Sequence, residues 1–287
     1  MLINEVSKST GLTKKAIEYY TMQELVTPKI LENGYRDYSQ KDIEVLNKIS
    51  ILRKLDISTE DIKNILSDES GNTLKTLAVR KELSYQREQA KKKILNKLSS
   101  GKSYSEVNKE LLTVENNKTI TEKLLDAFPG YYGRYICLHF SSFLDEPITS
   151  DRQQLAYERI ISFLDNVPSL ELSEELKEYL LEATNDIGTE QITDLIKNMK
   201  KTIESPEDFL SSNKEVLEQY LAYRKSDDYK NSPIGKIMEL TKEFNRANGY
   251  YDIFIPAMKE LSSSYSEYYN QLEETNRKLL EQYPSVN

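Results

Sequence analysis

Apolar residues recur at helical spacing along most of this 287-residue chain. Four sets follow the i, i+3, i+4, i+7 pattern, and each set makes one apolar face of the kind seen on an amphipathic helix. The four sets lie at 157–164, 176–183, 192–199 and 237–244. One further long helix is expected from about residue 250 to 282. Because β-alternation does not appear in this part of the chain, the pattern predicts a mainly α fold.

The first seventy residues show a different pattern, with short helices around an expected hairpin. Helices are expected at 3–9, at 13–22, and after the capping residues Ser39 and Ser58. Asn33-Gly34 separates extended runs near 27–30 and 35–38, and both residues tolerate positive φ. Helix, turn, helix and hairpin in this order are typical of a winged helix-turn-helix. Such a unit places one helix in the major groove and uses the wing to grip phosphates.

Six stretches in this region match a known family in order and spacing. They are Ile3-Asn4-Glu5-Val6, Thr10-Gly11-Leu12-Thr13, Ile17-Glu18-Tyr19-Tyr20, Glu24-Leu25-Val26-Thr27-Pro28, Asn33-Gly34-Tyr35-Arg36-Asp37-Tyr38-Ser39 and the run from Leu52 to Ile62. Through them the N-terminal quarter of the chain resembles the MerR family of bacterial transcriptional regulators. Two positions depart from the family pattern: Glu18 stands where Arg is usual, and Asp56 where Gly is usual.

Seven side chains in this unit are candidate DNA contacts. They are Lys14, Lys15, Tyr19, Tyr35, Arg36, Arg53 and Lys54. Lys14 and Lys15 begin the expected recognition helix, from which side chains reach base edges or phosphates. Outside this motif, each of the seven would be interpreted as a solvated charge or a core aromatic.

The segment after the DNA-binding unit is expected to form one long helix, from Leu74 to Leu98, before Ser99-Ser100-Gly101 breaks it. The resemblance implies that this helix pairs with its twin in an antiparallel coiled coil and makes a homodimer. The alternative is an exposed, charged linker helix. The expected division is therefore a DNA-binding domain at 1–70, a dimerisation or linker helix at 71–103, and an all-helical effector domain at 104–287.

Charge is distributed unevenly along the chain. The net charge is −8, yet basic residues outnumber acidic ones in 1–103, chiefly around Lys91-Lys92-Lys93. The acidic excess lies in 104–287 and would repel DNA, which helps to orient the protein. No apolar run approaches the roughly 20 residues that cross a bilayer. We therefore expect a cytoplasmic protein without a membrane partner.

The residues that carry most enzyme chemistry are scarce. The chain has one His, His139, and one Cys, Cys137. Metal- and redox-sensing members of the resembled family need several thiolates, so no metal or other cofactor is expected. No phosphate loop, zinc-protease motif or nucleophile elbow is present, and we expect no enzymatic activity.

The C-terminal part is rich in tyrosine, with 20 Tyr and no Trp in the whole chain. Seven of its side chains are candidate ligand contacts: Tyr131, Tyr132, Tyr135, His139, Phe143, Tyr250 and Tyr251. A pocket lined by such rings would suit planar or cationic molecules through stacking and cation–π contact. The alternative is that these aromatic stripes form the hydrophobic core.

These observations favour a dimeric, ligand-responsive regulator that binds a palindromic promoter. The resemblance implies that it bends and untwists promoter DNA with an overlong spacer so that RNA polymerase can engage. The expected inducer is an aromatic or cationic toxic compound. Two alternatives stay open: a helical drug-binding protein that mainly sequesters its ligand and has a secondary regulatory role, and a regulator controlled by a protein partner.

Overall fold

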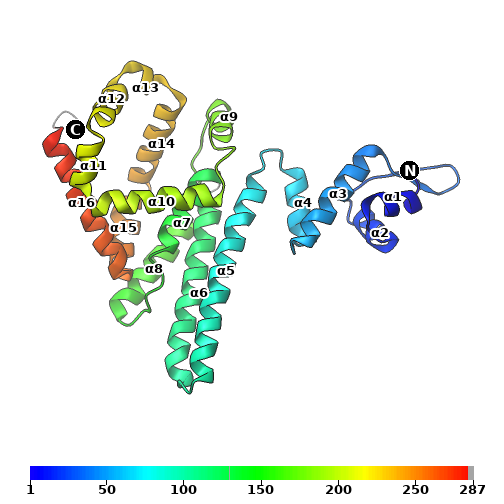
Figure 1. The fold of residues 1–287 in the computed structure, drawn as a ribbon, viewed down its shortest axis with the longest axis horizontal. Coiled ribbons are helices and arrows are strands. Elements are labelled where there is room, and N and C mark those ends of the chain that lie inside the picture. The colour runs from blue at the N-terminus through cyan, green and yellow to red at the C-terminus, as the bar shows by residue number, and fades with distance from the viewer. Residues whose placement is uncertain (129, 284–287) are drawn as a thin grey trace. The chain divides into compact units, whose positions relative to one another are not determined.

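The computed structural model describes residues 1–128 and 130–283, which divide into two compact units between Leu74 and Lys75. Apart from one two-stranded hairpin, the regular elements of the described residues are helices (Figure 1). The mainly α fold predicted from apolar spacing is confirmed. The four predicted amphipathic segments lie within α8 (Asp151–Asn166), α9 (Glu174–Ala183), α10 (Thr189–Glu204) and α14 (Pro233–Ala247).

The first unit contains four helices and the hairpin. They are α1 (Ile3–Thr10), α2 (Lys14–Met22), β1 (Lys29–Ile30), β2 (Arg36–Asp37), α3 (Gln40–Lys54) and α4 (Thr59–Ser67). The hydroxyls of Thr13, Ser39 and Ser58 each accept a backbone N–H of the helix that follows, which satisfies a donor that the first turn leaves unpaired. The strands are antiparallel, with Lys29 opposite Asp37. The predicted helix and hairpin positions are confirmed in this unit.

The core of the first unit draws one or more apolar side chains from each helix and from the end of the wing. Its fully buried members are Val6, Ile17, Tyr38, Leu46, Ile49 and Ile62. Tyr38 follows β2 directly and is only 1% exposed. The wing therefore enters the core just after its second strand, while its tip stays in solvent.

The turn between α3 and α4 explains the substitution at Asp56. Asp56 has a φ of 55°, in the left-handed region that Gly adopts without steric cost and that Asp tolerates better than most residues. Arg53 stabilises the same turn, since its Nη1 donates to the Ile57 carbonyl at 2.7 Å. The turn thus keeps the conformation that a glycine would allow.

The described part of the second unit consists of helices and the segments that connect them. Besides α8, α9, α10 and α14, these helices are α5 (Asn72–Ser99), α6 (Tyr104–Ala127), α7 (Gly130–Ser141), α11 (Pro206–Ser212), α12 (Lys214–Lys225), α13 (Asp227–Asn231), the π-helix η1 (Tyr250–Phe254), α15 (Ile255–Leu261) and α16 (Ser263–Gln282). The core of this unit is mostly aliphatic, and it contains a cluster of aromatic rings that includes Phe140, Phe143, Phe254 and Tyr265.

Helices α5 and α6 form a long antiparallel pair (Figure 1). Lys97 near the end of α5 binds Glu110 at 2.7 Å, and Arg80 near its start binds Glu122 at 3.0 Å. Val79 and Leu83 of α5 belong to the core of the second unit. The helix expected after the DNA-binding unit is therefore present, and α6 of the same chain covers much of its apolar face.

The single helix expected from about 250 to 282 was wrong in two respects: its first turn is the π-helix η1, and the helix ends at Leu261 and starts again at Ser263. Pro256 has no N–H to donate to the preceding turn, and the wider π-helical turn of η1 lies directly before it. Ser262 is extended, with φ −123° and ψ 121°, and separates α15 from α16. Its hydroxyl caps α16 by accepting the Tyr265 N–H at 3.1 Å.

Glu146, in the segment between α7 and α8, completes that cap. Its carboxylate accepts the backbone N–H groups of Ser263 at 3.1 Å and Ser264 at 2.8 Å, and the hydroxyl of Ser262 at 3.1 Å. Burial alone would raise the pKa of Glu146, but the bonds from Ser263 and Ser264 outweigh it and lower the pKa to about 2. The ionised carboxylate thus ties two distant segments together.

Replacing Glu146 with Gln should lower the free energy of unfolding by about 2 kcal/mol at pH 7, because charge-assisted bonds to N–H groups are removed. The ordinary pKa of 4.5 exceeds the folded value, so the wild-type advantage is complete above pH 4.5 and fades as the pH falls toward about 2. Urea denaturation at several pH values measures the gap in the free energy of unfolding between the wild type and the variant. Glu178→Gln, at an exposed position on α9, is the control and should change little. A gap that does not depend on pH would contradict this role for Glu146.

Candidate DNA-binding surface and effector unit

Helix α2 separates its residues into a buried and an exposed side. Ile17 and Tyr20 are buried, whereas Lys14, Lys15 and Tyr19 are exposed. The first turn of α2 holds no acidic residue, so the positive end of the helix dipole adds to the two lysine charges. This end of the helix is suited to phosphate.

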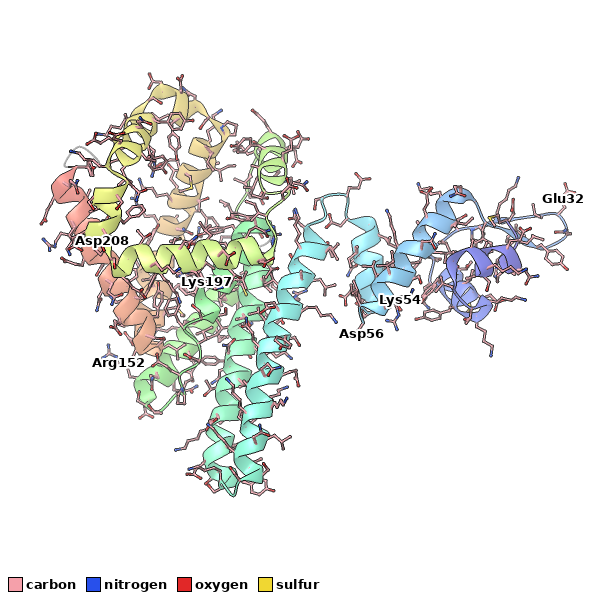
Figure 2. All side chains as sticks on the ribbon, in the orientation of Figure 1. Glu32, Lys54, Asp56, Arg152, Lys197 and Asp208 are labelled. Carbon is pink, nitrogen blue, oxygen red and sulfur yellow. The ribbon has the colours of Figure 1, made fainter. Side chains whose placement is uncertain are left out.

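The wing holds Tyr35 and Arg36 in solvent. The Leu31 N–H donates to the Tyr35 carbonyl at 2.8 Å, and the Gly34 N–H to the Leu31 carbonyl at 2.8 Å. Gly34 has a φ of 80°, as the tight tip requires. Tyr35 is 63% exposed, and Arg36 is exposed beside it. The tip itself carries Glu32, which points into solvent (Figure 2).

One buried contact links the wing to α2. The hydroxyls of Tyr38 and Thr21 lie 3.3 Å apart, and the Tyr38 N–H donates to the Met1 carbonyl at 2.9 Å. Sequence reasoning placed Tyr38 in the matched motif but assigned it no role. The signal was present, since Tyr38 is the first aromatic residue after an exposed strand. The contact fixes the distance between the exposed residues of α2 and those of the wing.

The two remaining candidates lie at the end of α3. Arg53 and Lys54 are exposed, and Figure 2 shows Lys54 at this end of the helix. Arg53 already donates to the Ile57 carbonyl, so its guanidinium has a structural role in the turn. Glu18 is exposed on α2 between Lys14 and Tyr19 in sequence. All seven candidate side chains are accessible within one unit.

The comparison with known families identifies this unit. Residues 1–69 match the MerR HTH family regulatory protein. The N-terminal unit is therefore a MerR-type helix-turn-helix domain. The match ends close to the boundary between the two structural units. No solved structure matches the chain.

Several relatives share the MerR domain. The HTH-type transcriptional regulator CueR of Yersinia pestis is 40% identical over 68 residues, which are 23% of this chain and 49% of that protein. The heavy metal-dependent transcription regulator 2 of Rhizobium meliloti is 37% identical over 68 residues, 23% of this chain and 46% of the relative. The HTH-type transcriptional activator mta of Bacillus subtilis is 23% identical over 145 residues, 50% of this chain and 52% of the relative. The chain thus spans about half the length of these relatives.

The predicted aromatic ligand residues are mostly packed against one another in the second unit. His139 lies in the centre: its ring centroid is 5.5 Å from that of Phe143 and 5.3 Å from that of Tyr268. The Tyr132 hydroxyl accepts a bond from Asn245 at 3.2 Å. Tyr135 stacks on His139 at 6.1 Å and donates to the Met199 sulfur at 3.1 Å. These contacts are those of a hydrophobic core.

The outer members of the aromatic set differ in exposure. Tyr250 stacks on Phe254 at 5.4 Å, and burial raises its pKa well above the ordinary value. Tyr251 is 46% exposed, and Tyr131 is partly buried. Phe143 borders a hollow of about 10 Å³, far smaller than a drug-like ligand needs. The structure thus brings these rings together by packing them against one another.

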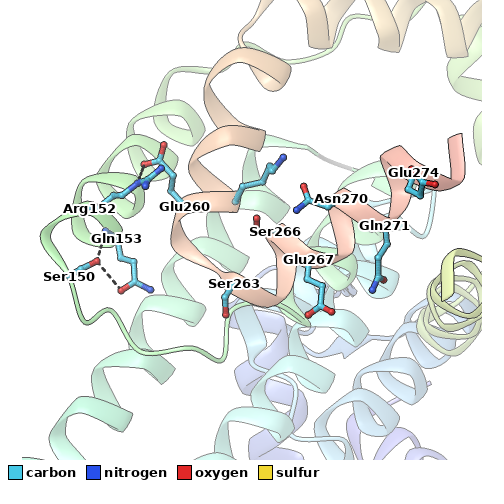
Figure 3. Close-up of a pocket in the computed structure, with 11 residues that line it drawn as sticks. Ser150, Arg152, Gln153, Glu260, Ser263, Ser266, Glu267, Asn270, Gln271 and Glu274 are labelled. Atoms are coloured by element: carbon cyan, nitrogen blue, oxygen red, sulfur yellow. Dashed lines mark hydrogen bonds and ion pairs between the residues drawn. The ribbon is translucent and has the colours of Figure 1, made fainter. Parts of the chain in front are cut away.

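A wide groove of the second unit is polar. It has a volume of about 880 Å³ and lies along the start of α16 (Figure 3). Arg152 pairs with Glu260 at 3.4 Å, and the Ser150 hydroxyl bonds the Gln153 side chain at 3.2 Å (Figure 3). Its eleven lining residues are all polar or charged. Because no aliphatic or aromatic residue lines it, the groove lacks the apolar side chains that predominate in small-molecule sites.

Neither a metal site nor a membrane span occurs in the described part of the chain. No group of three or more His, Cys, Asp or Glu side chains in 1–128 and 130–283 could hold a metal ion. Over the same residues, no helix is both long and apolar enough to cross a membrane.

Replacing His139 with Phe should remove an acid-sensitive weakness of the second unit. Burial, with the charge of Lys200 adding to it, lowers the pKa of His139 from 6.5 to about 4. Between pH 6.5 and about pH 4, His139 is therefore protonated in the unfolded chain but neutral in the folded chain. The free energy of unfolding consequently falls as the pH drops through this range. The variant should gain about 1–2 kcal/mol relative to wild type between pH 7 and pH 5. Denaturant titrations at both pH values measure this, and a parallel decline in both proteins would contradict it.

Proposed function

We propose that this chain is a transcriptional regulator that binds promoter DNA as a homodimer through its MerR domain. The observation that carries the proposal is the linked pair of exposed surfaces on α2 and the wing. Tyr38 and Thr21 join them, and the MerR match covers residues 1–69, which include both surfaces. Lys14 and Lys15 would enter or flank the major groove, while Tyr35 and Arg36 would clamp a phosphate.

Dimerisation would supply the additional DNA contacts that a single domain lacks. Residues 1–66 carry no net charge excess, so one copy offers a modest electrostatic attraction to DNA, and two copies double the contacts. Exposed apolar side chains along α5 support a contact with a second copy, since Leu74, Tyr85 and Leu95 are 44%, 62% and 63% exposed. They lie 11 and 10 residues apart, which keeps them close to one side of the helix. Such a dimer would read a palindromic site.

The regulatory step follows the resemblance to the family. The dimer would hold promoter DNA bent and untwisted, so that RNA polymerase can engage an overlong spacer. The helical second unit would act as the effector domain and shift the dimer between two arrangements by binding a small molecule better in one of them. The Tyr and Phe candidates give little support to an aromatic or cationic inducer, because their rings already pack against one another.

Replacing Arg36 with Met should weaken promoter binding about tenfold and reduce the salt dependence. Because each of the two protomers would then make one fewer phosphate contact, the slope of log affinity against log salt should become shallower by about two. Fluorescence anisotropy with a promoter duplex across a salt series measures both. Lys48→Met, at an exposed position of α3 outside the candidate set, is the matched control. If the Arg36 and Lys48 variants bind alike, the wing does not clamp the backbone.

Replacing Glu18 with Arg tests the departure from the family pattern. A carboxylate beside a phosphate repels it, so the Arg variant should bind promoter DNA more tightly and with a steeper salt slope. Glu18→Gln is the control, because it removes the repulsion without adding a cation. Its promoter affinity should lie between those of the wild type and the Arg variant. An unchanged slope in both variants would move Glu18 away from the DNA.

A further inference from the structure

A cavity of about 450 Å³ lies between α5 and α6 in the second unit and is closed on one side by the segment after α7. Its α5 wall contains Leu83, Arg87, Ala90 and Ile94, which follow one another at intervals of four, three and four residues. This spacing places them on one face of the helix. The arginine therefore stands within an otherwise apolar stripe.

The floor of the cavity is apolar. Leu83 and Ile94 are each 3% exposed, and Leu144, from the segment after α7, is 6% exposed. Val114 of α6 and Pro147 complete the apolar lining. Asn117 holds the closing segment in place, since its side-chain amide donates to the Leu144 carbonyl at 3.3 Å. A hydrocarbon body would find cover on three sides of this cavity.

The charges around this cavity do not cancel. Lys97 is bound to Glu110 at 2.7 Å, so these two neutralise each other. Asp145 also lines the cavity, so the three basic and two acidic lining residues leave one positive charge in excess. Lys93 lines the cavity and is exposed at its rim, and Arg87 extends from the wall. The cavity thus presents positive charge beside an apolar floor.

Arg87 has an unmet hydrogen-bonding requirement. Its side chain is 14% exposed, and its Nη1 is buried with no hydrogen-bond partner among the described residues. The Glu122 carboxylate lies 3.8 Å from its Nη2 and already accepts a bond from Arg80 at 3.0 Å. A buried guanidinium N–H without an acceptor costs free energy. A carboxylate in the cavity would pair with the charge of the guanidinium through the part of Arg87 that lines it.

We propose that this cavity binds a small amphipathic organic anion, with a carboxylate on Arg87 and Lys93 and an apolar body on Leu83, Ile94 and Leu144. This inference rests on the proposed function, for it assigns the inducer site of the effector unit and gives the inducer a negative charge. Helix α5 begins at Asn72, before the boundary between the units, and so belongs to both. A ligand wedged between α5 and α6 therefore acts on the helix that continues from the DNA-binding domain.

Calorimetric titration of the full chain with decanoate tests the proposal. Decanoate should bind saturably with one molecule per protomer, and decanol and decyltrimethylammonium, which share its chain, should bind at least tenfold more weakly. Arg87→Met and Lys93→Met should each weaken decanoate about tenfold or more, since each removes a charged partner of the carboxylate. Ala90→Phe should abolish binding by filling the cavity. Arg152→Met and Lys92→Met, at exposed positions outside the cavity, should bind like the wild type.

Two outcomes would overturn the proposal. One is decanoate binding that is absent, or that is unchanged in the Arg87 and Lys93 variants while circular dichroism shows them folded. The other is equal binding of the decyl cation. Promoter affinity measured on the same preparations separates this inference from the proposed function. If the protein binds the promoter but not decanoate, the proposed ligand site is wrong and the proposed function stands. If it binds decanoate but not the promoter, the proposed function is wrong and the ligand site stands.

Discussion

The DNA-binding surface depends on the burial of one tyrosine. Tyr38 is 1% exposed, its hydroxyl meets Thr21 of α2, and its backbone N–H meets Met1 before α1. A two-stranded hairpin of this length has little stability of its own. Its position relative to α2 is therefore set by the side chain that enters the core. With that anchor, the exposed residues of the wing and of the recognition helix keep one spacing, as a rigid reader of DNA requires.

The second unit uses one helix for several purposes. Helix α5 contributes Val79 and Leu83 to the core, forms ion pairs with α6 along its length, and still leaves Tyr85 and Leu95 in solvent. This helix begins at Asn72, just before the boundary between the two units. In the proposed mechanism, ligand binding and dimerisation act on different sides of the same helix, and differential affinity couples them.

Local chemistry made much of this fold predictable. Asn33-Gly34 indicated the hairpin, and capping residues and apolar spacing located α1 to α5, α8 to α10 and α14. The break at Ser262 and the π-helical turn before Pro256 were missed, although a proline inside a helical pattern is itself a warning. His139 and Phe143 were among the aromatic candidates, but a local sequence pattern does not say which residues pack against them. Tyr268, more than a hundred residues later, contacts both rings. The cavity at Arg87 also depends on contacts across α5, α6 and the segment after α7, which one helix pattern cannot reveal.

The central claim is that two copies of this chain read DNA symmetrically through α2 and the wing. Footprinting on the promoter upstream of the chain's own gene, at low and moderate salt, tests it most directly. We expect protection of two half-sites related by a two-fold axis, with a bend between them and release of both together as salt rises. Protection of one isolated half-site, or no protection even at low salt, would contradict it.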